Sequence, residues 1–267
     1  MKPGLALPGL ILAVCALACA QDTAGDRIVV PARNTSHPRV VNAHVLNGGI
    51  TVKAYSGKEV IVESGAAASR RTAATVSGMR RIDPVERGLE VVEEDNVITV
   101  RNRLNGGAHL VITVPTDTSL NLKSNNGSLS VEGVHGEIEA NSLNGSITLA
   151  NISGTVTAHS LNAALKITMD RVDQGKPLSF STLNGAIDVT LPADVKANLT
   201  IKTDHGSVYS DFDITLGGTR AITEKNDTPD GKFRVRIDRT IRGTINGGGV
   251  EMIFNTFNGR VTIGKKK

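Results

Sequence analysis

The sequence predicts an all-β fold, a β-solenoid (single-stranded β-helix-like) of stacked coils of about 18–22 residues. The phrase Ser-Leu-Asn-Gly-Ser-Ile-Thr-Leu at 142–149 returns in variant form around 126, 162, 184 and 258. The corners at Asn126, Asn144, Asn162, Asn184 and His205 follow one another in steps of 18, 18, 22 and 21 residues. Apolar residues lie two apart on both sides of each corner, as strands with one buried face require. Together these patterns predict two short strands per coil.

The first 20 residues are typical of a signal peptide. A basic second residue precedes an apolar run at 5–19, and the segment 18–20 fits the small-x-small cleavage rule. The run is shorter than the about 20 apolar residues that a membrane span needs. We therefore expect export to the periplasm, the outer envelope or the extracellular space. A lipid anchor at Cys19 or Cys15, or a retained N-terminal anchor, is the alternative.

Composition narrows the classes of function. Both cysteines lie in the leader, so a chain cleaved after Ala20 can form no disulfide and no thiolate metal site. The net charge of +4 is too mild to indicate nucleic-acid binding. Tryptophan is absent and aromatic residues make up 3%, so stacking platforms are scarce. We expect no nucleic-acid partner and no transmembrane span in the mature chain.

The predicted elements follow the leader in order. A linker at 21–37 precedes one β-solenoid domain at 38–264, and a basic tail at 265–267 ends the chain. Alternating apolar residues predict strands within 40–62 and at 89–92, 97–101 and 109–114, before the repeats. Two insertions interrupt the alternation, at 63–87 (a loop or short helical segment) and at 211–231 (an exposed loop).

The recurring corners have a structural explanation. Glycine accepts a positive φ and asparagine tolerates it, so an Asn-Gly corner can absorb the change of parity between the apolar residues that flank it. Stacking would align the asparagines in one bonded column and the preceding Ser or Thr residues in a second column. The predicted corner residues are Asn126, Gly127, Asn144, Gly145, Asn162, Asn184, Gly185, Asn258 and Gly259. Asn162-Ala163 and His205-Gly206 depart from the pattern.

No residues have the spacing of a catalytic, metal or cofactor site, and we predict none. The histidines form no i, i+4 pair, although His159 and His205 lie near corners of neighbouring coils and could approach each other. The carboxylates that could serve a glycosidase or lyase are Glu132, Glu137, Glu139 and Asp188. Their spacing is not diagnostic, and solvated turn charges are the default interpretation.

A basic segment is the most one-sided charge in the chain. It comprises Lys232, Arg234, Arg236, Arg239 and Arg242. Such a face could bind an anionic partner, a lipid head group or an acidic glycan, through simple electrostatics. We favour the simpler interpretation, an edge strand protected by charge against aggregation.

The chain resembles the bacterial putative-adhesin family of β-strand-repeat proteins, a domain of unknown function. The resemblance rests on Val-Leu-Asn-Gly-Gly-Ile-Thr-Val at 45–52, Val-Ile-Thr-Val-Pro at 111–115, the repeated Asn-Gly corners and Asn-Gly-Arg-Val-Thr-Ile at 258–263. It covers most of 38–264. Membership implies a β-solenoid in an envelope or secreted setting, with no established catalytic residues.

These observations predict an exported, non-catalytic cell-envelope protein with an adhesin-like or scaffold role. Its partner would be an envelope glycan, an anionic lipid or another envelope protein. The alternatives are a carbohydrate-active enzyme (polysaccharide lyase or glycosidase) on a β-helix, and a docking partner in envelope stress sensing. A pocket with convergent carboxylates would favour the enzyme, and a flat polar face would favour binding. Function is expected where the repeat breaks, at 63–87, at His205 and at 211–242.

Overall fold

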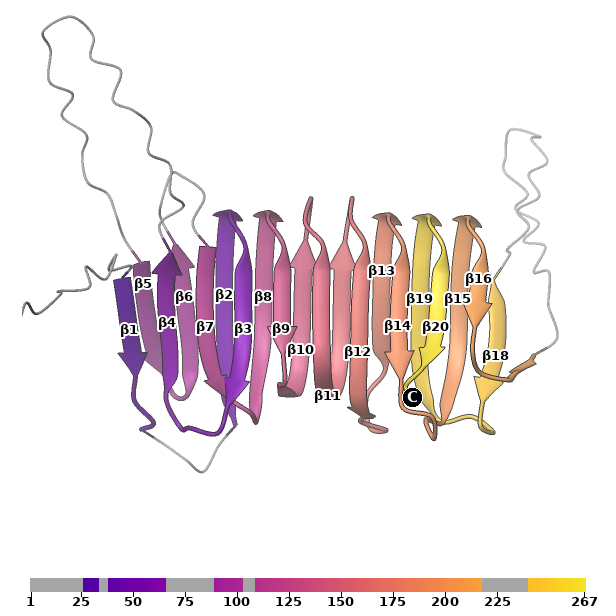
Figure 1. Cartoon of the computed structure of the whole chain (residues 1–267), viewed down its shortest axis with the longest axis horizontal. Coiled ribbons are helices and arrows are strands. Elements are labelled where there is room, and N and C mark those ends of the chain that lie inside the picture. The colour runs from indigo at the N-terminus through magenta and orange to yellow at the C-terminus, as the bar shows by residue number, and fades with distance from the viewer. Residues whose placement is uncertain (1–25, 34–37, 66–88, 103–108, 218–239) are drawn as a thin grey trace, which may run out of the picture.

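The computed structural model of the chain describes residues 26–33, 38–65, 89–102, 109–217 and 240–267. In this part of the chain all regular elements are strands, and the predicted β-solenoid is confirmed. The strands stand side by side along the long axis of an elongated molecule (Figure 1). No helix among the described residues is long and apolar enough to cross a bilayer. The predicted signal peptide lies outside the described residues.

The strands alternate between two faces of the solenoid, and the polypeptide turns from one face to the other at each corner. In chain order they are β1 (Asp26–Val30), β2 (Arg39–Asn47), β3 (Ile50–Tyr55), β4 (Val60–Gly65), β5 (Leu89–Glu94), β6 (Val97–Asn102), β7 (His109–Pro115), β8 (Thr118–Asn126), β9 (Leu129–Glu132), β10 (His135–Ser142), β11 (Ile147–Ser160), β12 (Leu165–Val172), β13 (Leu178–Asn184), β14 (Ile187–Leu191), β15 (Ala197–His205), β16 (Val208–Ser210), β17 (Ile214–Leu216), β18 (Ile241–Ile245), β19 (Val250–Asn258) and β20 (Val261–Lys265).

Each coil, or rung, pairs in parallel with its neighbours, with like residues above like. Ser142 of β10 is in register with Ser124 of β8 on one side and with Ser160 of β11 on the other. On the opposite face Ile147 is in register with Leu129 and with Leu165. The long strand β11 serves both faces, and it turns at Asn151 and Gly154, which both have positive φ.

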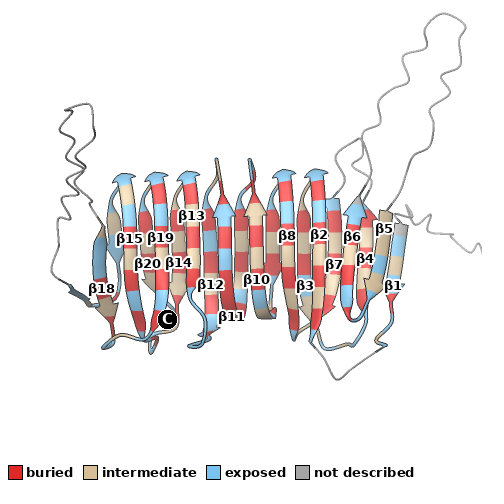
Figure 2. Ribbon diagram, turned by 180° about the vertical axis from the view of Figure 1, so that it is seen from behind, coloured by how far each residue is buried: buried red, intermediate tan, exposed pale blue. Residues whose placement is uncertain are grey.

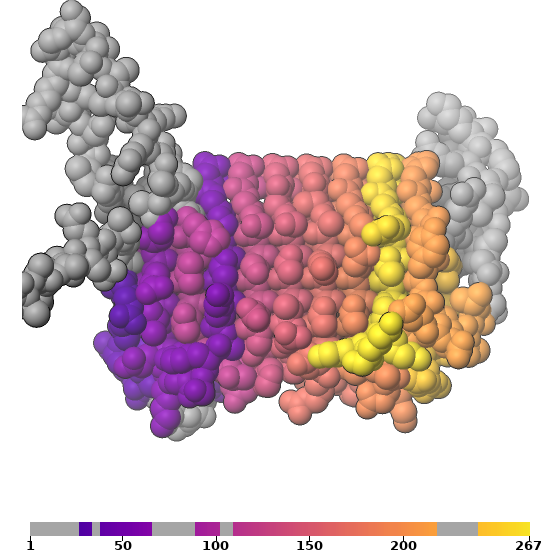
Figure 3. Space-filling view, in the orientation of Figure 1, coloured from indigo at the N-terminus to yellow at the C-terminus, as the bar shows by residue number. Residues whose placement is uncertain are grey.

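The rungs do not stack in the order of the sequence. The β2–β3 rung lies between the β6–β7 and β8–β9 rungs. The β19–β20 rung likewise lies between the β13–β14 and β15–β16 rungs. Figure 3 shows both insertions, since an indigo rung interrupts the magenta ones and a yellow rung separates two orange ones. The first and last rungs of the chain are therefore held inside the stack.

Antiparallel strands close both ends of the stack. The predicted linker 21–37 contains β1, in which Ile28 is in register with Val62 of β4. The strand β4 extends to Gly65, into the predicted insertion 63–87, and the rest of that insertion lies outside the described residues. The predicted loop 211–231 contains β17, which pairs with β18. These short strands pair with the backbone of the outermost rungs, where no further rung is stacked.

The core runs along the axis between the two faces. Leu120 and Leu122 before the corner, and Leu129 and Val131 after it, are all buried, so the parity changes across the corner as the sequence predicts. Figure 2 shows the result as buried and exposed residues alternating along each strand. Aliphatic side chains dominate the core, because each position stacks against the same kind of side chain one rung away.

Candidate functional site

The corner asparagines form one hydrogen-bonded column along an edge of the solenoid. The Nδ2 atom of each donates to the Oδ1 atom of the next at 2.9–3.1 Å. The column runs from Asn258 through Asn184, Asn162, Asn144 and Asn126 to Asn47. His205 follows Asn258 in the register and takes the asparagine position of the β15–β16 rung. The amides are exposed, so the column is both a structural ladder and a surface.

A second column of hydroxyl groups lies inside the same corners. Ser124 Oγ donates to the carbonyl of Gly48 at 3.1 Å, and Thr182 Oγ1 donates to the carbonyl of Ala163 at 3.0 Å. Ser160, which is fully buried, donates to the carbonyl of Gly145 at 3.3 Å. Each hydroxyl therefore satisfies a corner carbonyl of the neighbouring rung, and burial makes that satisfaction necessary.

The corner glycines are needed for a reason other than the one predicted. We expected a positive φ at Gly127, Gly145, Gly185 and Gly259, but none of the four has one. A Cβ atom on Gly145 would instead lie 1.9 Å from the carbonyl oxygen of Gly127. The rungs approach so closely at the corner that a side chain there would meet the backbone of the next rung.

An exposed apolar row runs beside the asparagine column. It consists of the residues that precede the asparagines on four successive rungs, of which Leu143, Leu183 and Phe257 are exposed and Leu161 is half-buried. A polar row lies two residues before the apolar row on each strand, and thus on the same side of the sheet. That row consists of His44, Lys123, Asn141, His159, Ser181, Asn255 and Lys202. Rungs lie about 4.8 Å apart, so both rows are nearly continuous along the axis.

The asparagine column ends beside a shallow hollow of about 770 Å³, which we call the C-terminal hollow. The β15–β16 rung contributes His205, Ser207 and Tyr209 to its lining, and the β19–β20 rung contributes Arg260. The full lining is Lys166, Asp188, His205, Gly206, Ser207, Tyr209, Gly259, Arg260 and Thr262. The hollow thus lies where the repeat breaks, because other corners have Ser, Ala or Gly at the position of Arg260.

Positive charge is in excess over negative charge in the C-terminal hollow. Asp188 is in register with Lys166 on the neighbouring rung. Its Oδ1 atom lies 3.8 Å from Nε of Arg260, near the outer limit of an ion pair. Two permanent cations therefore share one carboxylate. The His205 ring lies edge-on to Phe257 at the rim, with ring centroids 5.3 Å apart.

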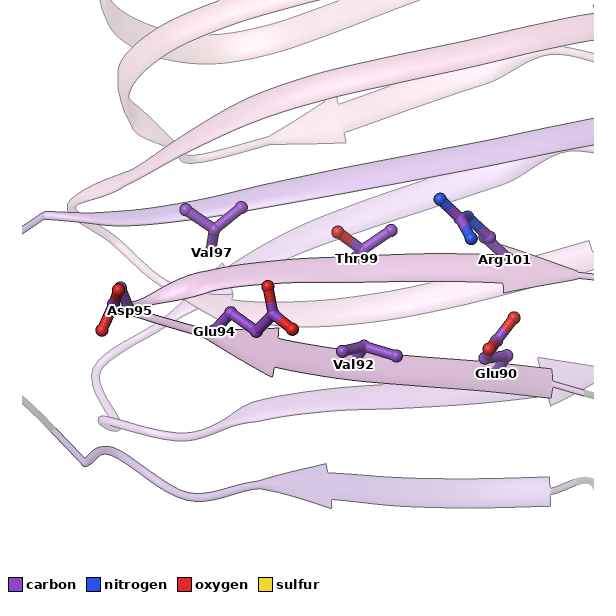
Figure 4. Close-up of a pocket in the computed structure, with 7 residues that line it drawn as sticks. All are labelled: Glu90, Val92, Glu94, Asp95, Val97, Thr99 and Arg101. Atoms are coloured by element: carbon purple, nitrogen blue, oxygen red, sulfur yellow. The ribbon is translucent and has the colours of Figure 1, made fainter.

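A second hollow, of about 530 Å³, lies over the β5–β6 hairpin (Figure 4). Glu90, Glu94 and Asp95 line it together with Arg101. Glu90 is the register partner of Arg101 across the hairpin. Glu90 and Glu94 are four residues apart on one strand, which separates their Cα atoms by about 13 Å at 3.3 Å per residue. Figure 4 shows the two carboxylates at different points along the strand, without the facing arrangement that glycosidases use.

The other predicted carboxylates are dispersed. Glu132 lies on β9, on the face opposite to Glu137 and Glu139 of β10. Glu137 is 2.7 Å from Nζ of Lys176, and this hydrogen bond raises the pKa of Lys176 above its ordinary value of 10.5. Glu139 accepts hydrogen bonds from the amides of Asn121 and Asn141. Among the described residues no three His, Cys, Asp or Glu side chains gather as a metal site would require.

The structure separates His159 from His205, which the sequence had left free to approach each other. His159 is in register with Ser181, Asn255 and then Lys202, three rung steps away, whereas His205 continues the asparagine column. The inserted β19–β20 rung supplies the additional separation.

Of the predicted basic segment, Arg242 lies exposed on β18 between β15 and β17. Lys232, Arg234, Arg236 and Arg239 lie outside the described residues.

Sequence reasoning missed three residues of the C-terminal end, namely Arg260, Tyr209 and Phe257. The break in the repeat at His205 was visible, as was the arginine after the last Asn-Gly corner. Their proximity was not, because His205 and Arg260 are far apart in the chain and only the inserted last rung brings them together.

Comparison with solved structures finds similarity to two that are described as adhesion proteins. One is described as a putative cell adhesion protein from Clostridium sporogenes, with 10% identity, a TM-score of 0.42, and coverage of 91% of this chain and 100% of that one. The other is described as a putative adhesin from Bacteroides fragilis, with 10% identity, a TM-score of 0.31, and coverage of 92% and 98%. No curated protein matches the chain.

The family assignment comes from the sequence pattern of the rungs. The Toastrack DUF4097 pattern matches residues 41–246, which is most of the chain, from β2 to the end of β18. The last rung, β19–β20, follows the matched region. The chain therefore belongs to the Toastrack DUF4097 family, a domain of unknown function.

Proposed function

We propose that the chain is an exported, non-catalytic protein of the cell envelope that binds an envelope glycan along the edge formed by its corners. The observation that carries this proposal is the alignment of the apolar row with the amide column and the polar row. Apolar side chains exposed singly are normal on a protein surface, but a contiguous patch marks an interaction site. Here Leu143, Leu183 and Phe257 lie in one row, and the half-buried Leu161 occupies the rung between the first two.

A glycan fits this edge better than a compact protein partner would. Sugars present apolar C–H faces and hydroxyl groups on one molecule, and the edge presents leucines beside amide, hydroxyl and imidazole groups. Both rows extend along the axis for several rungs, which suits a linear chain. Placement in the envelope is supported by the signal-like segment at 1–20.

The non-catalytic interpretation is supported by the positions of the acidic groups. Glycosidases and lyases need two carboxylates, or a carboxylate with a base, at facing positions in one groove. Glu137 and Glu139 are engaged by Lys176 and by two asparagines, and Glu132 lies on the other face.

Cosedimentation with isolated envelope fractions tests the proposal. The full chain is expected to sediment with a glycan-containing fraction. A variant with Leu143→Ser, Leu183→Ser and Phe257→Ser should lose most of this binding, since it removes the three exposed side chains of the apolar row but keeps the amide column. Leu216→Ser is the matched control, because Leu216 is also exposed but lies on β17, away from the row. Failure to bind any fraction, or equal loss in the control, would contradict the proposal.

A further inference from the structure

We propose that the C-terminal hollow binds a carboxylated sugar residue, such as a uronic acid, within an acidic glycan. This inference rests on the proposed function and names the ligand class of one subsite. The hollow spans the rungs of Leu161, Leu183 and Phe257 on the other side of their corners, and His205 at its rim lies edge-on to Phe257. A glycan lying along the corners would therefore run directly beside it.

The charges of the hollow select a carboxylate. Lys166 and Arg260 are permanent cations, whereas Asp188 is the one carboxylate in the lining. The Asp188–Arg260 separation of 3.8 Å is too long for a strong hydrogen bond. A guanidinium group has five N–H donors in a planar fork, and it binds a carboxylate best through two parallel bonds. Arg260 can therefore bind a ligand carboxylate while Asp188 holds it in place from one side.

The uncharged groups of the hollow select a sugar. Tyr209 and Phe257 are the aromatic side chains that the described residues expose most, at 59% and 43%, and both lie at this end of the molecule. An exposed tyrosine offers a flat apolar ring with a polar tip, which suits the C–H face of a sugar. Ser207 and Thr262 add hydroxyl groups that can both donate and accept. A bare phosphate would need the cations but no aromatic wall.

The dimensions agree with this class of ligand. The volume of about 770 Å³ falls within the about 300–1,000 Å³ typical of small-molecule sites. Because the hollow is shallow, we expect one sugar residue to bind weakly. Contacts of adjoining sugars with the apolar row would add to the affinity of a longer chain.

Titration calorimetry of the full chain with trigalacturonate tests the inference. Trigalacturonate should bind, and its fully methyl-esterified form should bind at least about tenfold more weakly, as expected when a charged contact is lost. Arg260→Ser places at this corner a residue that other corners already have, so it should fold, and it should weaken trigalacturonate binding by about tenfold. Arg171→Ser, on an exposed part of β12, is the charge-matched control and should bind like the unmodified chain.

Three results would overturn the inference. The first is no binding of trigalacturonate, the second is equal binding of the esterified form, and the third is equal competition by inorganic phosphate. A thermal unfolding curve for Arg260→Ser establishes that the variant is folded. If trigalacturonate fails to bind while the chain still sediments with an envelope fraction, the ligand class is wrong and the proposed function stands. If neither binds, both are wrong.

Discussion

Replacing Asn144 by alanine tests whether the asparagine column stabilises the solenoid as a bonded ladder. Asn144 lies within the column, where its Nδ2 donates to Asn126 and its Oδ1 accepts from Asn162, both at 2.9 Å. A hydrogen bond contributes a net ~0.5–1.5 kcal/mol to stability. These amides are exposed, so the lower part of that range applies, about 0.5–1 kcal/mol per bond. Asn144→Ala should therefore lower the free energy of unfolding by about 1–2 kcal/mol.

Asn258→Ala is the matched control, because Asn258 ends the column. Its Nδ2 donates to Asn184 at 2.9 Å, and the described residues provide no side-chain donor to its Oδ1. This variant loses one bond of the ladder and should be destabilised by about half as much as Asn144→Ala. Urea denaturation followed by circular dichroism measures both values. Equal losses in the two variants would refute the ladder, because they would mean that each asparagine contributes only as a turn residue.

Three further variants probe the corners and one surface pair. Gly145→Ala should lower the free energy of unfolding by about 1–3 kcal/mol through overpacking, because its Cβ would lie 1.9 Å from a backbone oxygen. Gly264→Ala, whose Cβ would lie 3.5 Å from its nearest atom, should change stability little. Equal effects of the two variants in urea denaturation would contradict this expectation. Ser160→Ala should cost about 1 kcal/mol by leaving a buried carbonyl without its donor, and an unchanged unfolding midpoint would count against it. Glu137→Gln should return the pKa of Lys176 towards 10.5 in an NMR titration. Because folding raises this pKa, the contribution to stability is present below 10.5 and is lost as the pH rises through the folded value. The exposure of both side chains keeps it small.

The period of the sequence was sufficient to predict the solenoid and the alignment of its corners. Local spacing determines which residues of a rung point inward, and rungs of similar length place Ser142 next to Ser124 and Ser160. The reason for the corner glycines could not be predicted in the same way. A dipeptide such as Asn144-Gly145 suggests a special φ, whereas the real constraint is a backbone atom of another rung.

The periodicity of the sequence could not predict the order in which the rungs stack. Equivalent rungs offer similar pairing surfaces, so the pattern does not say that β19–β20 lies between β13–β14 and β15–β16. That choice depends on which ends are closed by antiparallel strands, and the strands β1 and β18 that close them carry no repeat signal. The C-terminal hollow depends on the same choice, because Arg260 enters it from the inserted rung.

Cysteine cross-linking across the inserted rung tests this arrangement most directly. Asn255 is in register with Ser181 on one side and with Lys202 on the other, and adjacent rungs are about 4.8 Å apart, within the range for disulfides. In a chain that carries Cys15→Ser and Cys19→Ser, the pairs Ser181→Cys with Asn255→Cys and Asn255→Cys with Lys202→Cys should form disulfides on mild oxidation. Ser181→Cys with Lys202→Cys, two rungs apart, should stay reduced. Rapid oxidation of that last pair, with the Ser181→Cys and Asn255→Cys pair left reduced, would mean that the rungs stack in sequence order and would contradict both the inserted rung and the hollow it builds.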